Sequence, residues 1–131
     1  MNIRFRNIIA IILTSVWVNA SEFIRNEILL KTYWVDHYQS LGMSFPSGPT
    51  NGMIWIAWGF LFALAIFLIS RKFDLIQTAL IAWLMAFVLM WVVTFNLNVL
   101  PGAILIYAVP LSMLETFIGS YLCIKISPNK Q

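Results

Sequence analysis

The sequence predicts an all-α polytopic membrane protein, built as a bundle of four transmembrane helices with both termini on the inner side. Three observations support this fold class. Hydrophobic residues make up 61% of the chain and charged residues 10%, whereas a soluble domain usually carries about 25% charged residues. Several runs without charge are long enough to cross a bilayer. The basic residues stand in small groups at the ends of these runs, as topology signals do.

The first span is expected at about residues 7–26. Its strongly apolar part, 8–18, is shorter than the roughly 20 residues that a spanning helix needs. Val18-Asn19-Ala20 also fits a signal-peptide cleavage site. Two alternatives therefore stay open for residues 1–20. They are either retained as the first membrane helix, which the unbroken helical pattern past Ala20 favours, or removed as a signal peptide.

Residues 27–52 are expected outside the membrane. They begin with a polar extension of the first helix, in which Glu27 and Lys31 form a favourable i,i+4 pair. This extension either runs on beyond the bilayer or bends to lie in the interface. A loop rich in proline and glycine follows at 42–52 and prevents the helix from continuing. Thr50 or Asn51 is expected to cap the next helix.

The second span is expected at 53–70 and the third at 75–95, and neither contains a charged residue. The short polar turn between them makes an antiparallel hairpin. The fourth span, 102–124, is interrupted by Pro110 and carries Glu115. Because the length suits one domain, the sequence predicts a single transmembrane domain over 1–131.

The distribution of basic residues predicts the orientation. With the N-terminus inside, six basic residues lie on the inner side and two, Arg25 and Lys31, on the outer side. The six are Arg4, Arg6, Arg71, Lys72, Lys125 and Lys130. We therefore expect a multi-pass protein of a cell membrane, with the bacterial inner membrane as its location.

Glu115 is the foremost candidate for a functional residue. An ionisable side chain inside a span costs a few kcal/mol unless it is neutral, paired or hydrated, so such a residue often binds a proton or a ligand. Helical rise places it about two-thirds of the way in from the outer face. The alternative is that a protonated Glu115 hydrogen-bonds a neighbouring helix and holds the two together.

A polar stripe on the first helix provides the other candidates. At 100° per residue, Ser15, Asn19, Glu22 and Asn26 share one face, with Arg25 beside Glu22. These side chains are expected to face other helices or water, because polar groups in lipid need partners. Helical rise separates Glu22 from Glu115 by about 10–15 Å in depth. We therefore expect them to be stations on one polar path and not a carboxylate pair.

Other chemistry has little support. Asp36 and His37 point about 100° apart on a helix and cannot chelate an ion together, so no metal site is expected. No cofactor motif, nucleophile–base arrangement or basic patch for nucleic acid is visible. Whether the chain is an enzyme stays open, with the balance against it.

Two functions from different classes remain. In the first, the polar stripe and Glu115 line a cavity that binds or translocates a small molecule, an ion or a proton. In the second, the protein is a structural or accessory subunit that docks a partner through residues 21–39, and Glu115 joins two helices. The expected partners are membrane lipid and either a second copy of the chain or another membrane protein.

Overall fold

The computed structural model describes residues 1–129, and all regular elements in this range are helices. In chain order they are α1 (Ile3–Phe23), the π-helical η1 (Ile24–Leu29), α2 (Lys31–Ser40), α3 (Pro49–Ser70), α4 (Leu75–Trp83), the π-helical η2 (Leu84–Val88), α5 (Leu89–Asn96), the 3-10 helix η3 (Gly102–Ile104) and α6 (Leu105–Ile126). Lys130, which the orientation argument includes, lies outside the described residues.

Four stretches of the described chain are long and apolar enough to cross a membrane. They are Ile3–Leu29, Pro49–Ser70, Leu75–Asn96 and Gly102–Ile126. The predicted all-α fold with four spans is therefore confirmed. The large apolar side chains left exposed on these helices, such as Ile106 and Val92, suit contact with lipid.

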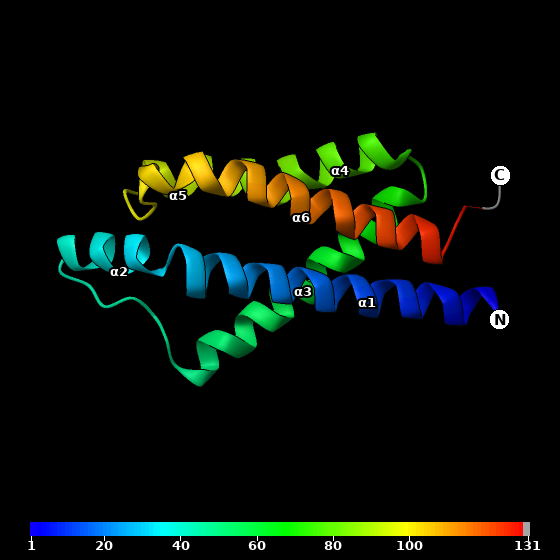
Figure 1. The fold of residues 1–131 in the computed structure, drawn as a ribbon, viewed down its shortest axis with the longest axis horizontal. Coiled ribbons are helices and arrows are strands. Elements are labelled where there is room, and N and C mark those ends of the chain that lie inside the picture. The colour runs from blue at the N-terminus through cyan, green and yellow to red at the C-terminus, as the bar shows by residue number, and fades with distance from the viewer. Residues whose placement is uncertain (130–131) are drawn as a thin grey trace.

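Successive spans run antiparallel, so that the start of α1 and the end of α6 lie at one end of the bundle (Figure 1). We call this the terminal end. The opposite end, the loop end, carries α2, the 41–48 loop and the turn between α5 and α6. Helix α1 packs against both α3 and α6, and α4 packs against α6. Ala10, Thr14 and Val18 on α1 are fully buried, so residues 1–20 are part of the bundle in this structure.

Local capping explains where several helices begin. The Asn2 side chain accepts a hydrogen bond from the Arg4 amide, and Asp74 forms a reciprocal capping box with Gln77. The expected cap at Thr50 or Asn51 is wrong. Gly48 caps α3 instead, because Pro49 at the first helical position already has the fixed φ of a helix and no amide hydrogen to satisfy.

The first span is longer than expected. It extends through η1 to Leu29, and the chain breaks from helical geometry at Leu30, where φ is −114° and ψ is 6°. Helix α2 follows in broadly the direction of α1 in the view of Figure 1. The ring of Phe45 packs against Trp34 and Tyr38, with centroids 5.8 and 5.3 Å apart. This packing holds the 41–48 loop against α2.

Small side chains allow the helices to approach closely. Ala108, Ser112, Thr116 and Ser120 repeat along one face of α6, and all are buried. Thr116 and Ser120 each donate their hydroxyl to the carbonyl four residues earlier, which satisfies them within the helix. Close approach is also seen at Gly59 on α3, where an added Cβ atom would lie 2.5 Å from the side-chain amide of Asn19.

Hydrogen bonds from polar side chains join three helices at the terminal end. Arg6 Nε donates to the Ile126 carbonyl at 2.9 Å. Arg71, after α3, donates to the Ser127 carbonyl, and the Ser127 hydroxyl donates to Asn7 Oδ1. The two arginines thus satisfy carbonyls at the C-terminal end of α6, where the helix dipole also favours positive charge. We call these contacts the terminal lock.

Candidate functional site

Two π-helical segments from different spans meet toward the loop end. Arg25 lies in η1 and Phe87 in η2, and the Arg25 guanidinium carbon is 5.1 Å from the centre of the Phe87 ring. A guanidinium at this distance from an aromatic face is held by a cation–π interaction. Single π-helical turns are rare and occur frequently at functional sites. Here the two π-helical turns place the Arg25 guanidinium against the Phe87 ring.

Arg25 also joins two acidic residues from different helices. Its Nη2 donates to Glu22 Oε1 one turn earlier, and its Nη1 lies 3.6 Å from Glu115 Oε1 on α6. The three side chains are 0–7% exposed. We call Glu22, Arg25 and Glu115 the ionic cluster. It links the first and fourth spans.

The ionic cluster contains one more acid than base. The second and third spans contribute no charged side chain that could balance it. Among the described residues, neither Glu115 carboxyl oxygen nor Arg25 Nη1 has a hydrogen-bond partner. A buried carboxylate without a full partner is costly in a low-dielectric medium. One further positive charge would therefore balance the cluster, and either a proton or a bound cation can supply it.

Hydrogen bonds hold Glu22 from its other side. Asn26 Nδ2 donates to Glu22 Oε2 at 2.9 Å, and Trp34 Nε1 donates to Asn26 Oδ1 at 3.2 Å. This chain of bonds connects α1, η1 and α2. It fixes the position of the Glu22 carboxylate, because each of its two oxygens accepts from a different donor.

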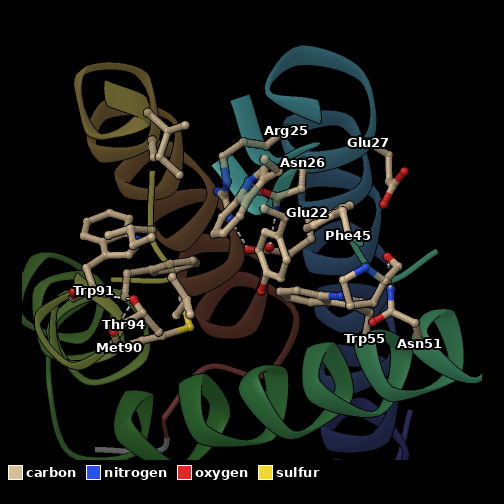
Figure 2. Close-up of a pocket in the computed structure, with 18 residues that line it drawn as sticks. Glu22, Arg25, Asn26, Glu27, Phe45, Asn51, Trp55, Met90, Trp91 and Thr94 are labelled. Atoms are coloured by element: carbon tan, nitrogen blue, oxygen red, sulfur yellow. Dashed lines mark hydrogen bonds and ion pairs between the residues drawn. The ribbon is translucent and has the colours of Figure 1, made fainter. Parts of the chain in front are cut away.

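A cavity of about 230 Å³ lies against the ionic cluster on the side of the loop end. Figure 2 shows residues from α1 and η1, from α3 and from α5 converging on it. Glu22 and Arg25 belong to its wall, whereas Glu115 does not. Six aromatic residues also line it: Trp34, Tyr38, Phe45, Trp55, Phe87 and Trp91. The cavity thus combines an aromatic wall with a buried acid.

A second cavity, of about 400 Å³, lies next to the first and shares Glu22, Asn26 and Trp55 with it. Its wall includes Lys31, whose ammonium is 2.7 Å from Glu27 Oε2. That ion pair is partly exposed, with side chains 43% and 29% accessible. The second cavity contains Asn19 as well, so part of the predicted polar stripe borders it.

The predicted candidate residues divide into two groups. Glu22, Arg25 and Glu115 come together in the ionic cluster, with Asn26 bound to Glu22. Asn19 and Ser15 lie nearer the N-terminus of α1. There, Asn19 Nδ2 donates to the Ser15 carbonyl at 3.0 Å. Ser15 lines neither cavity.

The expected separation of Glu22 from Glu115 is wrong, because both contact the same guanidinium. The Glu115 backbone carbonyl accepts from Trp17 Nε1 at 2.9 Å, so its backbone is level with Trp17. Side chains on a helix lean toward its N-terminus. On the antiparallel α1 and α6, the side chains of Arg25 and Glu115 therefore lean toward each other. Counting helical rise alone ignores this lean and the length of the side chains.

Several residues of the cavity were not among the sequence candidates. Phe87, Trp91 and Thr94 come from the third span, and Phe45 from the loop. Nothing in the sequence marks a π-helical turn or tells which of many aromatic residues face inward.

His37 and Asp36 take no part in the site. His37 Nε2 is 2.8 Å from the Asn98 carbonyl oxygen, in a contact between α2 and the turn after α5. Within the described part of the chain, no three histidine, cysteine, aspartate or glutamate side chains are grouped so that they could hold a metal ion.

Comparison with known proteins finds no matching family model, no similar curated protein and no similar solved structure.

Proposed function

We propose that this protein binds a small molecule in the cavity at the loop end, as a binding or translocating protein of the membrane. The observation that carries the proposal is the position of an unbalanced ionic cluster directly beside an aromatic cavity. Concave sites with an apolar wall and a few convergent polar groups are the usual form of ligand sites. The multi-pass membrane location follows from the four spans. The inner location of both termini and the bacterial inner membrane stay predictions from the sequence.

The ionic cluster is a poor device for stability alone. Replacing a buried ion pair with apolar side chains is often neutral or stabilising, because desolvation offsets the attraction between the charges. The cluster also leaves polar atoms without hydrogen-bond partners among the described residues. Unsatisfied buried groups of this kind are rare and call for an explanation in terms of a ligand, a proton or strain. Glu22 and Arg25 belong to the cavity wall, so a ligand there can reach the cluster through them, whereas Glu115 lies outside the wall.

One observation supports the alternative that the protein is an accessory subunit. Helix α2 has no buried residue, and Asp36 on it is exposed, so part of the 21–39 segment is free to contact another protein. However, Glu22 and Arg25 are buried in the bundle and cannot form such a surface. If docking occurs there, Asp36→Lys should release a co-purifying protein, whereas Glu115→Gln should not.

Filling the cavity tests the proposal. Thr94 lines the cavity, whereas its neighbour Val93 is 56% exposed on the outside of the bundle. We expect Thr94→Phe to remove a retained small molecule that native mass spectrometry detects on the wild-type protein in nanodiscs. Val93→Phe, the matched control, should keep it. Wild-type protein without any retained molecule, or an unchanged one in Thr94→Phe, contradicts the proposal.

A further inference from the structure

We infer that the ligand of this cavity is a small organic cation, such as a protonated or quaternary amine. The inference rests on the proposed function and adds the chemical class of the ligand. Three features support it: the charge of the wall, the arrangement of the aromatic rings, and the size of the cavity.

The charged groups around the cavity favour a cation. Glu22 and Glu27 are the acids of its wall, and Arg25 is the one base in the described wall. Arg25 already pairs with Glu22, and its remaining nitrogen, Nη1, is buried and faces Glu115. Lys31 lies outside this wall but pairs with Glu27 at 2.7 Å, so the acid in excess is that of the ionic cluster. Glu115 is fully buried and lies outside the wall, behind the Arg25 guanidinium.

The aromatic residues surround the cavity from three directions. Trp34, Tyr38 and Phe45 form one group, with Trp34 and Phe45 stacked at an interplanar angle of 26°. Phe87 and Trp91 form a second group, with ring centroids 5.8 Å apart. Trp55 on α3 provides the third direction. Cages of aromatic rings bind ammonium groups through the negative faces of the rings, and one face of Phe87 already holds the Arg25 guanidinium.

Inorganic cations and anions fit less well. A hard metal ion needs about six oxygen ligands, and no group of three suitable side chains occurs within residues 1–129. An anion would meet the acidic excess of the wall and cluster. The volume of about 230 Å³ is below the roughly 300–1,000 Å³ of sites for drug-sized ligands. The ligand is therefore expected to be compact.

Calorimetric titration of the full chain in nanodiscs tests this class of ligand. The probes are choline, its uncharged isostere 3,3-dimethylbutan-1-ol, and propionate as a small anion. We expect choline to bind, and the uncharged isostere to bind about tenfold more weakly, because it lacks the cation–π and ionic attraction. Propionate should not bind.

Substitution of two acidic residues shows which of them attracts the cation. Glu22→Gln removes a charge from the wall and should weaken choline binding by about tenfold. Glu115→Gln changes an acid outside the wall and should weaken it less. Asp36→Asn, an exposed acid outside both cavities, is the control and should leave the affinity unchanged. Thermal unfolding of each variant shows that the protein is folded.

The possible outcomes separate this inference from the proposed function. Equal binding of choline and its uncharged isostere, both abolished by Thr94→Phe, overturns the inference and leaves the proposed function standing. Stronger binding of propionate than of choline also overturns the inference and leaves the proposed function standing. Absence of heat with every probe also overturns the inference, and the mass measurement on Thr94→Phe and Val93→Phe then decides the proposed function independently.

Discussion

At the scale of single residues, the charges of the ionic cluster determine which substitutions it tolerates. Arg25 has two acidic partners, and each of them alone can neutralise it. Removing either acid leaves one positive and one negative charge. Removing both leaves a buried guanidinium with no counter-charge, which is the costly situation in a low-dielectric environment.

We therefore expect Glu22→Gln and Glu115→Gln to fold with nearly the wild-type free energy of unfolding. The double variant should lose about 3–5 kcal/mol, the usual cost of an uncompensated buried charge. Thermal unfolding of the purified proteins in one detergent measures the difference. Additive, small effects in the double variant would show that Arg25 is solvated and that the cluster is not buried.

Gly59 allows a second prediction at this scale. Gly59→Ala places a Cβ atom 2.5 Å from the Asn19 amide, so it should cost about 1–3 kcal/mol of stability through overpacking. Asn19→Ala removes the clashing atoms and should restore most of the loss in the double variant. Gly52→Ala on the same helix meets nothing within 4 Å and serves as the control. A loss without rescue by Asn19→Ala would show that helix α3 needs glycine at position 59 for another reason.

At the scale of elements, the π-helical turns position the functional side chains. A π turn contains one extra residue relative to an α-helix. In η1 this residue sets the direction of the chain beyond Arg25, and so the position of Trp34, which donates to Asn26. The opposing η2 turn presents Phe87 to Arg25.

Deleting Ile28, which is 62% exposed, should convert η1 to an ordinary α-helix. Residues after the deletion then rotate by about 100° relative to α1. We expect the protein to stay folded and to lose the small molecule that it retains, because Trp34 and Tyr38 leave the cavity wall. Native mass spectrometry measures the retention, and Ile28→Ala, which keeps the length of η1, is the control. Full retention after the Ile28 deletion would mean that α2 is not needed for binding.

The elements also show what the sequence can and cannot predict. The four spans were predictable because long charge-free runs have few alternatives to membrane helices. The inward side of α1 was predictable because Glu22 and Asn26 need polar partners. The contact of Arg25 with Glu115 was not, because it depends on the lean of side chains across antiparallel helices. The cavity was not predictable either, since Phe45, Phe87 and Trp55 come from segments far apart in the chain.

At the scale of the whole molecule, the two ends of the bundle differ in construction. The terminal end is joined by the terminal lock, and the loop end contains both cavities. Between the ionic cluster and the terminal end, Ala10, Thr14 and Cys123 are fully buried. Thr14 Oγ1 lies 3.1 Å from Cys123 Sγ. Thr14 and Cys123 thus contact each other between α1 and α6 on that side.

The terminal lock gives a prediction for the stability of the bundle. Arg71→Gln should lower the free energy of unfolding by about 1–3 kcal/mol, because Arg71 donates to Ser127 and packs its guanidinium 4.5 Å from the centre of the Phe67 ring. Arg71→Lys should restore little, since an ammonium cannot reproduce the planar fork of donors. Lys72→Gln, next to it, is the control. Equal melting temperatures for all three variants would remove the terminal lock as a source of stability.

The contact between Thr14 and Cys123 has a consequence for how far a bound solute could travel. A solute that reaches Glu22 from the loop end has the buried Glu115, Thr14 and Cys123 beyond it, so in this arrangement of the helices it would leave by the opening through which it entered. Carrying it to the opposite compartment requires α1 and α6 to separate below the acids, or a second chain to complete the passage.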